Sequence, residues 1–441
     1  MTARPVDRAT ADDLVTLATD VGSAPMQVGA VLLLAGGAEL EVRRATEVIA
    51  ERILTVPRLR QRLEHTPIGC GRPVWVDDVD FDLHDHVTSV ECPAPGDEDA
   101  LLTVAAEVVG TRLPAERPLW RMTLVSGLDA GRTALIVAFH HVLADGIGGL
   151  AVLANLVDGA HADPVVDFPR PAPSTRELAI DAARTRLDAF TNLLASFRQV
   201  RDALVQLRPA TRAHAARCSL NRPTGPRRQF AVARADLDSI RRTAHACGAT
   251  VNDVVLTAVA AALHTLLLSR GESVDRFVVS VPVSARREAS ATHLGNQVGV
   301  IPIELPATGD LRGRLDTIAD TTRAAKQTTP AASIALLGPI FRLLARVGIF
   351  GWFINRQRLV HTFVTNLRGP DSQLCFLDEP ILDVIPIAVV TGNVTVSIAV
   401  LSYAGNLGVT VIADPDTCPD LAALRDAVQD ELDRLIGLTP D

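Results

Sequence analysis

Apolar residues in the first part of the chain alternate between strand-like runs and helical spacing. Residues 28–34 form a short continuous apolar run that predicts a buried strand, and residues 41–54 carry apolar positions at helical spacing. A second helix is predicted over residues 99–111 and a second strand over residues 121–125. This order of strands and helices is typical of a mixed α/β domain.

The pattern breaks within residues 165–174, which hold three prolines. Proline removes a backbone donor and cannot sustain a helix, so we place the exit from the first domain there. Residues 177–207 then predict one long helix, and residues 208–228 are rich in proline and arginine. The predicted organisation is an N-terminal domain over 1–165, a connector over 166–228 and a C-terminal domain over 229–441.

The predicted C-terminal domain begins with a strand near Phe230 and a helix over 237–247. Residues 252–268 predict an apolar helix, and the Asn252-Asp253 pair at its start is suited to capping the helix N-terminus. Residues 277–283 and 394–401 predict buried strands. A chain of 441 residues also exceeds the size at which a single hydrophobic core stops growing, which favours two domains.

Charge and composition exclude several classes of protein. The net charge of −8 argues against a nucleic-acid-binding protein, because such proteins present a concentrated basic face. The six cysteines show no regular spacing, which predicts reduced thiols. The first residues contain no apolar targeting segment, so we expect a cytoplasmic protein. The apolar stretch 331–354 contains Pro339, Arg342 and Arg346, which makes it amphipathic rather than membrane-spanning.

The catalytic residues are expected where the apolar run that begins at residue 133 ends in two histidines. His140 and His141 are followed, after three spacer residues, by Asp145 and Gly146. A neutral imidazole is the side chain best suited to take a proton from an attacking hydroxyl near pH 7. No serine or cysteine stands beside the histidines, so a direct reaction of the hydroxyl, without a covalent intermediate on the enzyme, is the simpler mechanism.

Two other roles are compatible with the histidines. A single histidine at the end of an apolar strand is usually a hydrogen-bonded structural residue, but the four positions of His-His-x-x-x-Asp-Gly occur together here. Histidine and aspartate are also metal ligands, yet adjacent residues of an extended segment point to opposite faces, so His140 and His141 cannot easily bind one ion. We therefore expect no metal and no cofactor.

The His-His-x-x-x-Asp-Gly motif resembles the signature of the chloramphenicol acetyltransferase-like superfamily. The flanking segments resemble, from end to end, the bacterial wax ester synthase/diacylglycerol acyltransferase family. They include APMQVG at 24–29, PRLRQRL at 57–63, RPLW at 117–120, LNRPTGPR at 220–227, SVPVS at 280–284 and TNLRGP at 365–370. The resemblance implies an α/β fold with two chloramphenicol acetyltransferase-like domains, each a mixed β-sheet flanked by helices, and an active site at their interface.

The resemblance also implies roles for individual residues. His141 would be the general base, and His140 would shape the site. Asp145 and Gly146 would orient the catalytic residues, and in related folds the aspartate pairs with an arginine. The substrate-binding candidates, each with a structural role as its alternative, are Trp120, Asn252, Asn296, Thr365, Asn366 and Arg368. Arg368 stands where the family usually has proline, and the N-terminus reads ATADD at 9–13 instead of the usual Leu-Ser-x-x-Asp.

The function implied is the transfer of a long-chain acyl group from acyl-CoA, as co-substrate, to diacylglycerol or to a long-chain alcohol. The alternatives are a polyketide-associated acyltransferase and a weakly catalytic paralogue that binds acyl-CoA or lipid. The amphipathic stretch 334–358 could also dock on the inner membrane or a lipid droplet. Its arginines would then face the headgroups and Phe350 and Trp352 the lipid; the alternative is a helix packed on its own domain.

Overall fold

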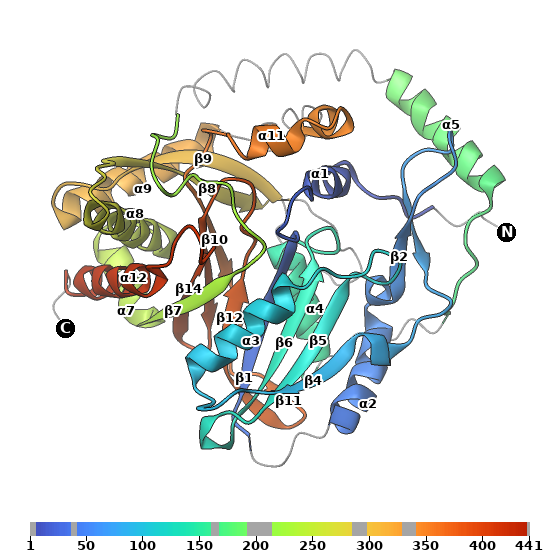
Figure 1. Cartoon of the computed structure of the whole chain (residues 1–441), viewed down its shortest axis with the longest axis horizontal. Coiled ribbons are helices and arrows are strands. Elements are labelled where there is room, and N and C mark those ends of the chain that lie inside the picture. The colour runs from blue at the N-terminus through green and yellow to red at the C-terminus, as the bar shows by residue number, and fades with distance from the viewer. Residues whose placement is uncertain are drawn as a thin grey trace.

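The computed structural model describes residues 6–36, 42–159, 167–191, 214–284, 298–328 and 341–438. Within these residues the chain folds into two large mixed sheets, each covered by helices (Figure 1). This arrangement confirms the predicted α/β class with two sheet-and-helix units. All six cysteines are unpaired, as their irregular spacing predicts.

The first sheet has the strand order β11-β12-β1-β6-β5-β4. Its strands are β1 (Gln27–Leu34), β4 (Val87–Glu91), β5 (Trp120–Ser126), β6 (Thr133–His140), β11 (Cys375–Phe376) and β12 (Glu379–Ile387). Only the β4–β5 pair is parallel among these strands. The helices α2 (Val42–Arg52), α3 (Glu98–Gly110) and α4 (Gly146–Leu156) belong to this half, and the ribbon of β2 (Gln61–Glu64) and β3 (Val74–Asp77) lies beside it.

β6 reads as one apolar run because both of its faces are covered. Its residues alternate between two cores: Leu135, Val137 and Phe139 pack with α2 and α4 on one side. Ala134 and Ile136 pack on the other side with α3 and with residues of the second sheet. The two halves therefore share a core, and the end of β6 lies close to their boundary.

The second sheet has the order β7-β14-β13-β10-β8-β9. Its strands are β7 (Gln229–Asp236), β8 (Arg276–Ser284), β9 (Val298–Pro306), β10 (Thr362–Arg368), β13 (Val396–Tyr403) and β14 (Asn406–Ala413). The helices of this half are α7 (Leu237–Ala246), α8 (Val251–Ser269), α9 (Leu311–Thr328), α11 (Phe350–Ile354) and α12 (Leu421–Ile436). α8 is long and apolar enough to cross a membrane, but 72% of its apolar window is buried, and it packs in the core of the second half.

Most predicted elements are confirmed within one or two residues, while two details differ. The helix predicted over 252–268 is α8, but its N-cap is Thr250, which forms a capping box with Asp253. Asn252 therefore lies inside the first turn and does not cap it. Of the helix predicted over 177–207, the structure describes α5 (Thr175–Thr191), and residues 192–207 lie outside the described residues.

The chain crosses between the two halves near its C-terminal end. β12 pairs antiparallel with β1, so residues 375–387 complete the first sheet although they follow most of the second sheet in sequence. The predicted divisions at residues 165 and 228 do not include this exchange. The described ends of the predicted connector pack on different halves: Arg170 Nε donates to Asp77 at 2.8 Å, and Ala215 N donates to the Arg358 carbonyl at 2.9 Å.

The N-terminal departure from the family pattern forms a regular helix. Thr10 caps α1 (Ala11–Thr19), and Asp13 completes a capping box with it. The residues that follow α1 lead directly into the site, because Asp20 is the C-cap of this helix.

Candidate active site

The two histidines are held in place by the backbones of the neighbouring strands. His140 N donates to the Leu119 carbonyl at 2.9 Å, one residue before β5. His141 N donates to the Met26 carbonyl at 2.8 Å, one residue before β1. The last residue of β6 and the residue after it are therefore fixed from both sides, although only His140 belongs to the strand.

His141 has the properties of a neutral base. Its side chain is half-buried, and its Nδ1 is buried without a well-formed hydrogen bond in the described part of the chain. Burial lowers the pKa of His141, an effect that outweighs the nearby carbonyls of His141 and Ala144 and the carboxylate of Asp145. Because Nδ1 is buried, Nε2 is the ring nitrogen left to meet a substrate.

His140 is 6% exposed and is engaged at both ring nitrogens. Its Nδ1 accepts a hydrogen bond from Val142 N at 3.0 Å, so its proton lies on Nε2, which is 3.3 Å from an Asp20 carboxylate oxygen. Arg112 donates to the same oxygen at 2.5 Å. His140 therefore shapes the site and has no free lone pair to act as a base.

The pKa of Asp20 reflects the same contacts. Burial alone would raise it, but hydrogen bonds from His140 and Arg112 hold the pKa of Asp20 below its ordinary value. The carboxylate is therefore charged at neutral pH and orients the His140 ring. Sequence reasoning missed Asp20 and Arg112, because they lie far from the motif along the chain and acidic and basic residues are common in it.

Asp145 is 1% exposed and is the N-cap of α4. Its Oδ1 accepts a hydrogen bond from Gly148 N at 2.7 Å. This contact fixes the turn between the histidines and α4.

Two glycines bring α4 close to its neighbours. A Cβ at position 149 would lie 2.5 Å from Cζ of Phe139, the residue before His140. A Cβ at position 146 would lie 2.9 Å from Cδ1 of Leu367 on β10. Gly146 thus brings the turn after the histidines against the second half of the molecule.

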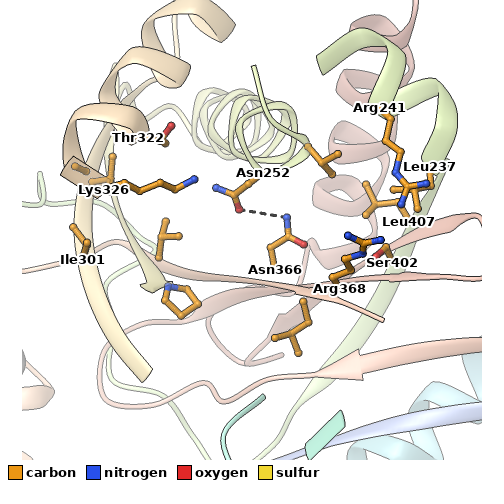
Figure 2. Close-up of a pocket in the computed structure, with 16 residues that line it drawn as sticks. Leu237, Arg241, Asn252, Ile301, Thr322, Lys326, Asn366, Arg368, Ser402 and Leu407 are labelled. Atoms are coloured by element: carbon orange, nitrogen blue, oxygen red, sulfur yellow. Dashed lines mark hydrogen bonds between the residues drawn. The ribbon is translucent and has the colours of Figure 1, made fainter. Parts of the chain in front are cut away.

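Three of the predicted substrate-binding residues lie together on one cavity. Asn252, Asn366 and Arg368 line a cavity of about 410 Å³ among α7, α8, α9 and the strands of the second sheet (Figure 2). Asn366 Nδ2 donates to Asn252 Oδ1 at 3.3 Å. Leu367, between Asn366 and Arg368 on β10, points to the opposite face of the strand and lies against Gly146. Only β10 therefore separates the cavity from the turn that carries Asp145.

The other three predicted substrate-binding residues do not join this group. Thr365 lies on β10 between Val364 and Asn366 but is not among the residues that line the cavity. Asn296 lies outside the described residues. Trp120 is 1% exposed, and its indole N–H donates to the Leu59 carbonyl at 2.7 Å. Its ring stacks on the buried ring of His86. In this structure Trp120 is a packing residue and offers no surface to a substrate.

The cavity is also lined by two basic side chains that sequence reasoning did not select. Arg241 on α7 and Lys326 on α9 line it with the residues already named. A signal for Lys326 was present in the sequence, because it is the single lysine in a chain with 43 lysine and arginine residues.

Comparisons with known proteins agree over nearly the whole chain. The family described as "Wax ester synthase/diacylglycerol acyltransferase catalytic domain" matches residues 10–255, and its C-terminal domain matches residues 294–436. The chain is 28% identical to the probable diacylglycerol O-acyltransferase tgs1 of Mycobacterium tuberculosis, over 94% of this chain and 92% of that protein.

Solved structures show the same fold. The wax ester synthase/diacylglycerol acyltransferase from Marinobacter aquaeolei superposes with a TM-score of 0.71 at 24% identity, covering 97% of this chain and 98% of that one. The first condensation domain of the CDA synthetase superposes with a TM-score of 0.62 at 18% identity, covering 99% and 97% of the two chains. At these identities the two structures support the fold alone.

Proposed function

The chain belongs to the wax ester synthase/diacylglycerol acyltransferase family, and we propose that it moves a long-chain acyl group from acyl-CoA to a lipid hydroxyl. Diacylglycerol as the acceptor would yield triacylglycerol, and a long-chain alcohol would yield a wax ester. The observation that carries the proposal is the environment of His141. Its pKa is lowered by burial, and it stands at the end of β6 beside the Asp145 turn.

The reaction follows from the state of His141. Nε2 of the neutral ring takes the proton of the acceptor hydroxyl while that oxygen attacks the thioester carbonyl carbon. The new C–O bond forms a tetrahedral intermediate, which collapses as the C–S bond breaks. The CoA thiolate leaves and takes the proton from His141, which returns to its neutral form. No acyl-enzyme is required.

The surrounding residues hold this geometry. Asp20 fixes the tautomer of His140, whose ring then accepts from Val142 N at 3.0 Å and stabilises the turn after His141. Asp145 fixes the start of α4 through Gly148 N. Because these groups are already paired in the protein, they act as positioning residues, and His141 alone is left to exchange a proton with the acceptor.

The test is transfer of label from radioactive palmitoyl-CoA to dioleoylglycerol or to hexadecanol, with the neutral lipids separated by thin-layer chromatography. We expect labelled triacylglycerol or wax ester from the wild type and at least about a hundredfold less from His141→Ala, as is typical for loss of a general base. His84→Ala is the matched control, because the side chain of His84 is 85% exposed. Equal activity of His141→Ala and the wild type would refute the assignment of the base.

We also propose that the enzyme reaches its lipid acceptors by docking through the surface around α11. Leu343, Val347, Ile349 and Trp352 are 61%, 57%, 48% and 64% exposed, an unusual group of apolar side chains on one short stretch. Trp352 is also stacked by Arg356, at 5.3 Å from the ring centroid, a pairing suited to the interface between lipid and water.

Two residues of this stretch take other positions than predicted. Phe350 is 2% exposed and packs on Phe341 and Phe353, so it is not a lipid-facing residue. Arg358 uses its guanidinium to hold the Ala215 carbonyl at 3.1 Å, so it anchors residues 214–216 and does not face headgroups.

Sedimentation with vesicles of phosphatidylcholine, phosphatidylglycerol and diacylglycerol tests the docking surface. Val347→Asp with Trp352→Asp should reduce the bound fraction several-fold, while activity on detergent-dispersed dioleoylglycerol should be retained. Ile68→Asp is the matched control, because Ile68 is fully exposed in a different segment. Unchanged sedimentation of the double variant would refute docking through this surface.

A further inference from the structure

We propose that the cavity lined by Asn252, Asn366 and Lys326 holds the phosphates and the pantetheine arm of the acyl-CoA donor. This inference rests on the proposed acyltransferase function and assigns one end of its site. The cavity has a volume of about 410 Å³ and lies in the second half of the molecule (Figure 2). Three features of its walls match the donor: basic side chains, a pair of amides and an apolar surface on the strands of the second sheet.

The cations provide the phosphate contacts. Lys326 extends from α9 toward Asn252, while Arg368 and Arg241 lie on the other side of the Asn252–Asn366 pair (Figure 2). The two arginines share Asp371, at 2.8 Å from Arg368 and 3.0 Å from Arg241. Lys326 has no ion pair among the described residues, so its charge is the one that the protein leaves uncompensated at this cavity.

The residue type at position 326 supports the same conclusion. In this chain almost every basic residue is arginine, and the single lysine stands on the wall of this cavity. Lysine presents a compact charge on a flexible stem, which suits phosphates that take several positions, whereas both arginines at this cavity are already paired with Asp371.

The amide pair suits the pantetheine arm. The bond from Asn366 Nδ2 to Asn252 Oδ1 occupies one donor and one acceptor of the pair. The Asn252 Nδ2 group and the Asn366 Oδ1 atom have no protein partner among the described residues, which leaves a donor and an acceptor side by side. Each amide of pantetheine carries the complementary acceptor and donor.

The remaining walls indicate the direction of the arm. Val281, Ile301 and Ile303 provide apolar surface, and Leu367, between Asn366 and Arg368 on β10, points its side chain across the strand to Gly146 in the turn after the histidines. Diacylglycerol and long-chain alcohols are uncharged, so neither acceptor can form an ion pair with an unpaired basic side chain. The cavity therefore fits the donor, and the acceptor must reach His141 from another side.

The experiment compares two donors that differ only in the nucleotide. Palmitoyl-CoA carries the phosphates, whereas S-palmitoyl-pantetheine has the same thioester and amides without them. Lys326→Met should raise the KM for palmitoyl-CoA roughly tenfold, the size of effect expected for a partly solvated contact with a charged group. Its KM for S-palmitoyl-pantetheine should equal that of the wild type, and Lys326→Arg should restore most of the loss for palmitoyl-CoA.

Arg323→Met is the matched control, because Arg323 lies one turn earlier on α9, pairs with Asp320 and does not line the cavity. Titration calorimetry with CoA alone measures the same contact without turnover. Weaker CoA binding by Lys326→Met than by Arg323→Met would support the inference even if the wild type transferred no acyl group. The same KM increase for both donors, or no change in KM and CoA affinity, would overturn it.

Discussion

A methyl group at position 149 tests the packing beneath the two histidines. The added Cβ would lie 2.5 Å from Cζ of Phe139, whereas non-bonded carbons pack at about 3.5–4 Å. The ring or the first turn of α4 must therefore move by about 1 Å. Phe139 is 4% exposed and precedes His140 directly, so it has little room to move without displacing the end of β6.

The expected magnitude combines two opposing effects. Overpacking a core costs about 1–3 kcal/mol, while replacing a helical glycine by alanine gains about 0.5–1 kcal/mol. Gly149→Ala should therefore lower the free energy of unfolding by up to about 2.5 kcal/mol, with a central value of ~1 kcal/mol. Because the displaced ring lies next to His140, acyl transfer should fall by more than the small loss of folded protein explains.

Urea unfolding and acyl transfer are measured for the wild type, Gly149→Ala, Phe139→Leu and the double variant. Phe139→Leu removes the ring atoms that the new methyl group would meet, so the double variant should recover part of the stability lost by Gly149→Ala. Gly110→Ala is the control, because its Cβ would meet only the Pro226 carbonyl oxygen at 3.9 Å. Strict additivity of the two changes, or a Gly149→Ala protein as stable as Gly110→Ala, would refute the packing argument.

Three further predictions concern ionisation and positioning. Because burial lowers the pKa of His141 below 6.5, the pH profile of kcat/KM should fall only below pH 6.5, as the base becomes protonated. Burial lowers the pKa of His361 to about 4, so protonation of this ring favours the unfolded chain. The free energy of unfolding, measured by urea titration, should fall by up to ~3 kcal/mol between pH 6.5 and 4. The fall should be smaller in His361→Gln. Asp20→Ala removes the acceptor of His140 Nε2 and should lower kcat roughly tenfold, measured as transfer at saturating donor, with little change in CoA affinity.

The local elements could be read from the sequence because they depend on neighbours a few residues apart. The apolar run that ends at His140 became β6, and the helical spacing over 99–111 became α3. The cap of α8 was misplaced by two residues, since Asn252 and Thr250 are both good capping residues and only the backbone geometry selects Thr250.

The candidate site was predicted in part for the same reason. His140, His141 and Asp145 lie within six residues and could be recognised as one motif. Trp120 was a substrate-binding candidate with a structural role as its alternative, and the sequence does not show that the carbonyl of Leu59 takes its N–H in the core. Its burial depends on Leu59 and on the ring of His86, which lie far from it in the chain.

The strands, the helices and the chemistry of the motif can be read from the amino-acid sequence, because hydrophobic periodicity and motif spacing are properties of short segments. Three features depend on the folded chain instead: residues 375–387 join the first sheet, Asp20 orients His140, and Lys326 shares a cavity with Asn252 and Asn366. Each of these contacts joins segments that are distant in sequence. Such contacts form only when burial of the two shared cores outweighs the entropy of closing long loops, and no local pattern records which segments then meet.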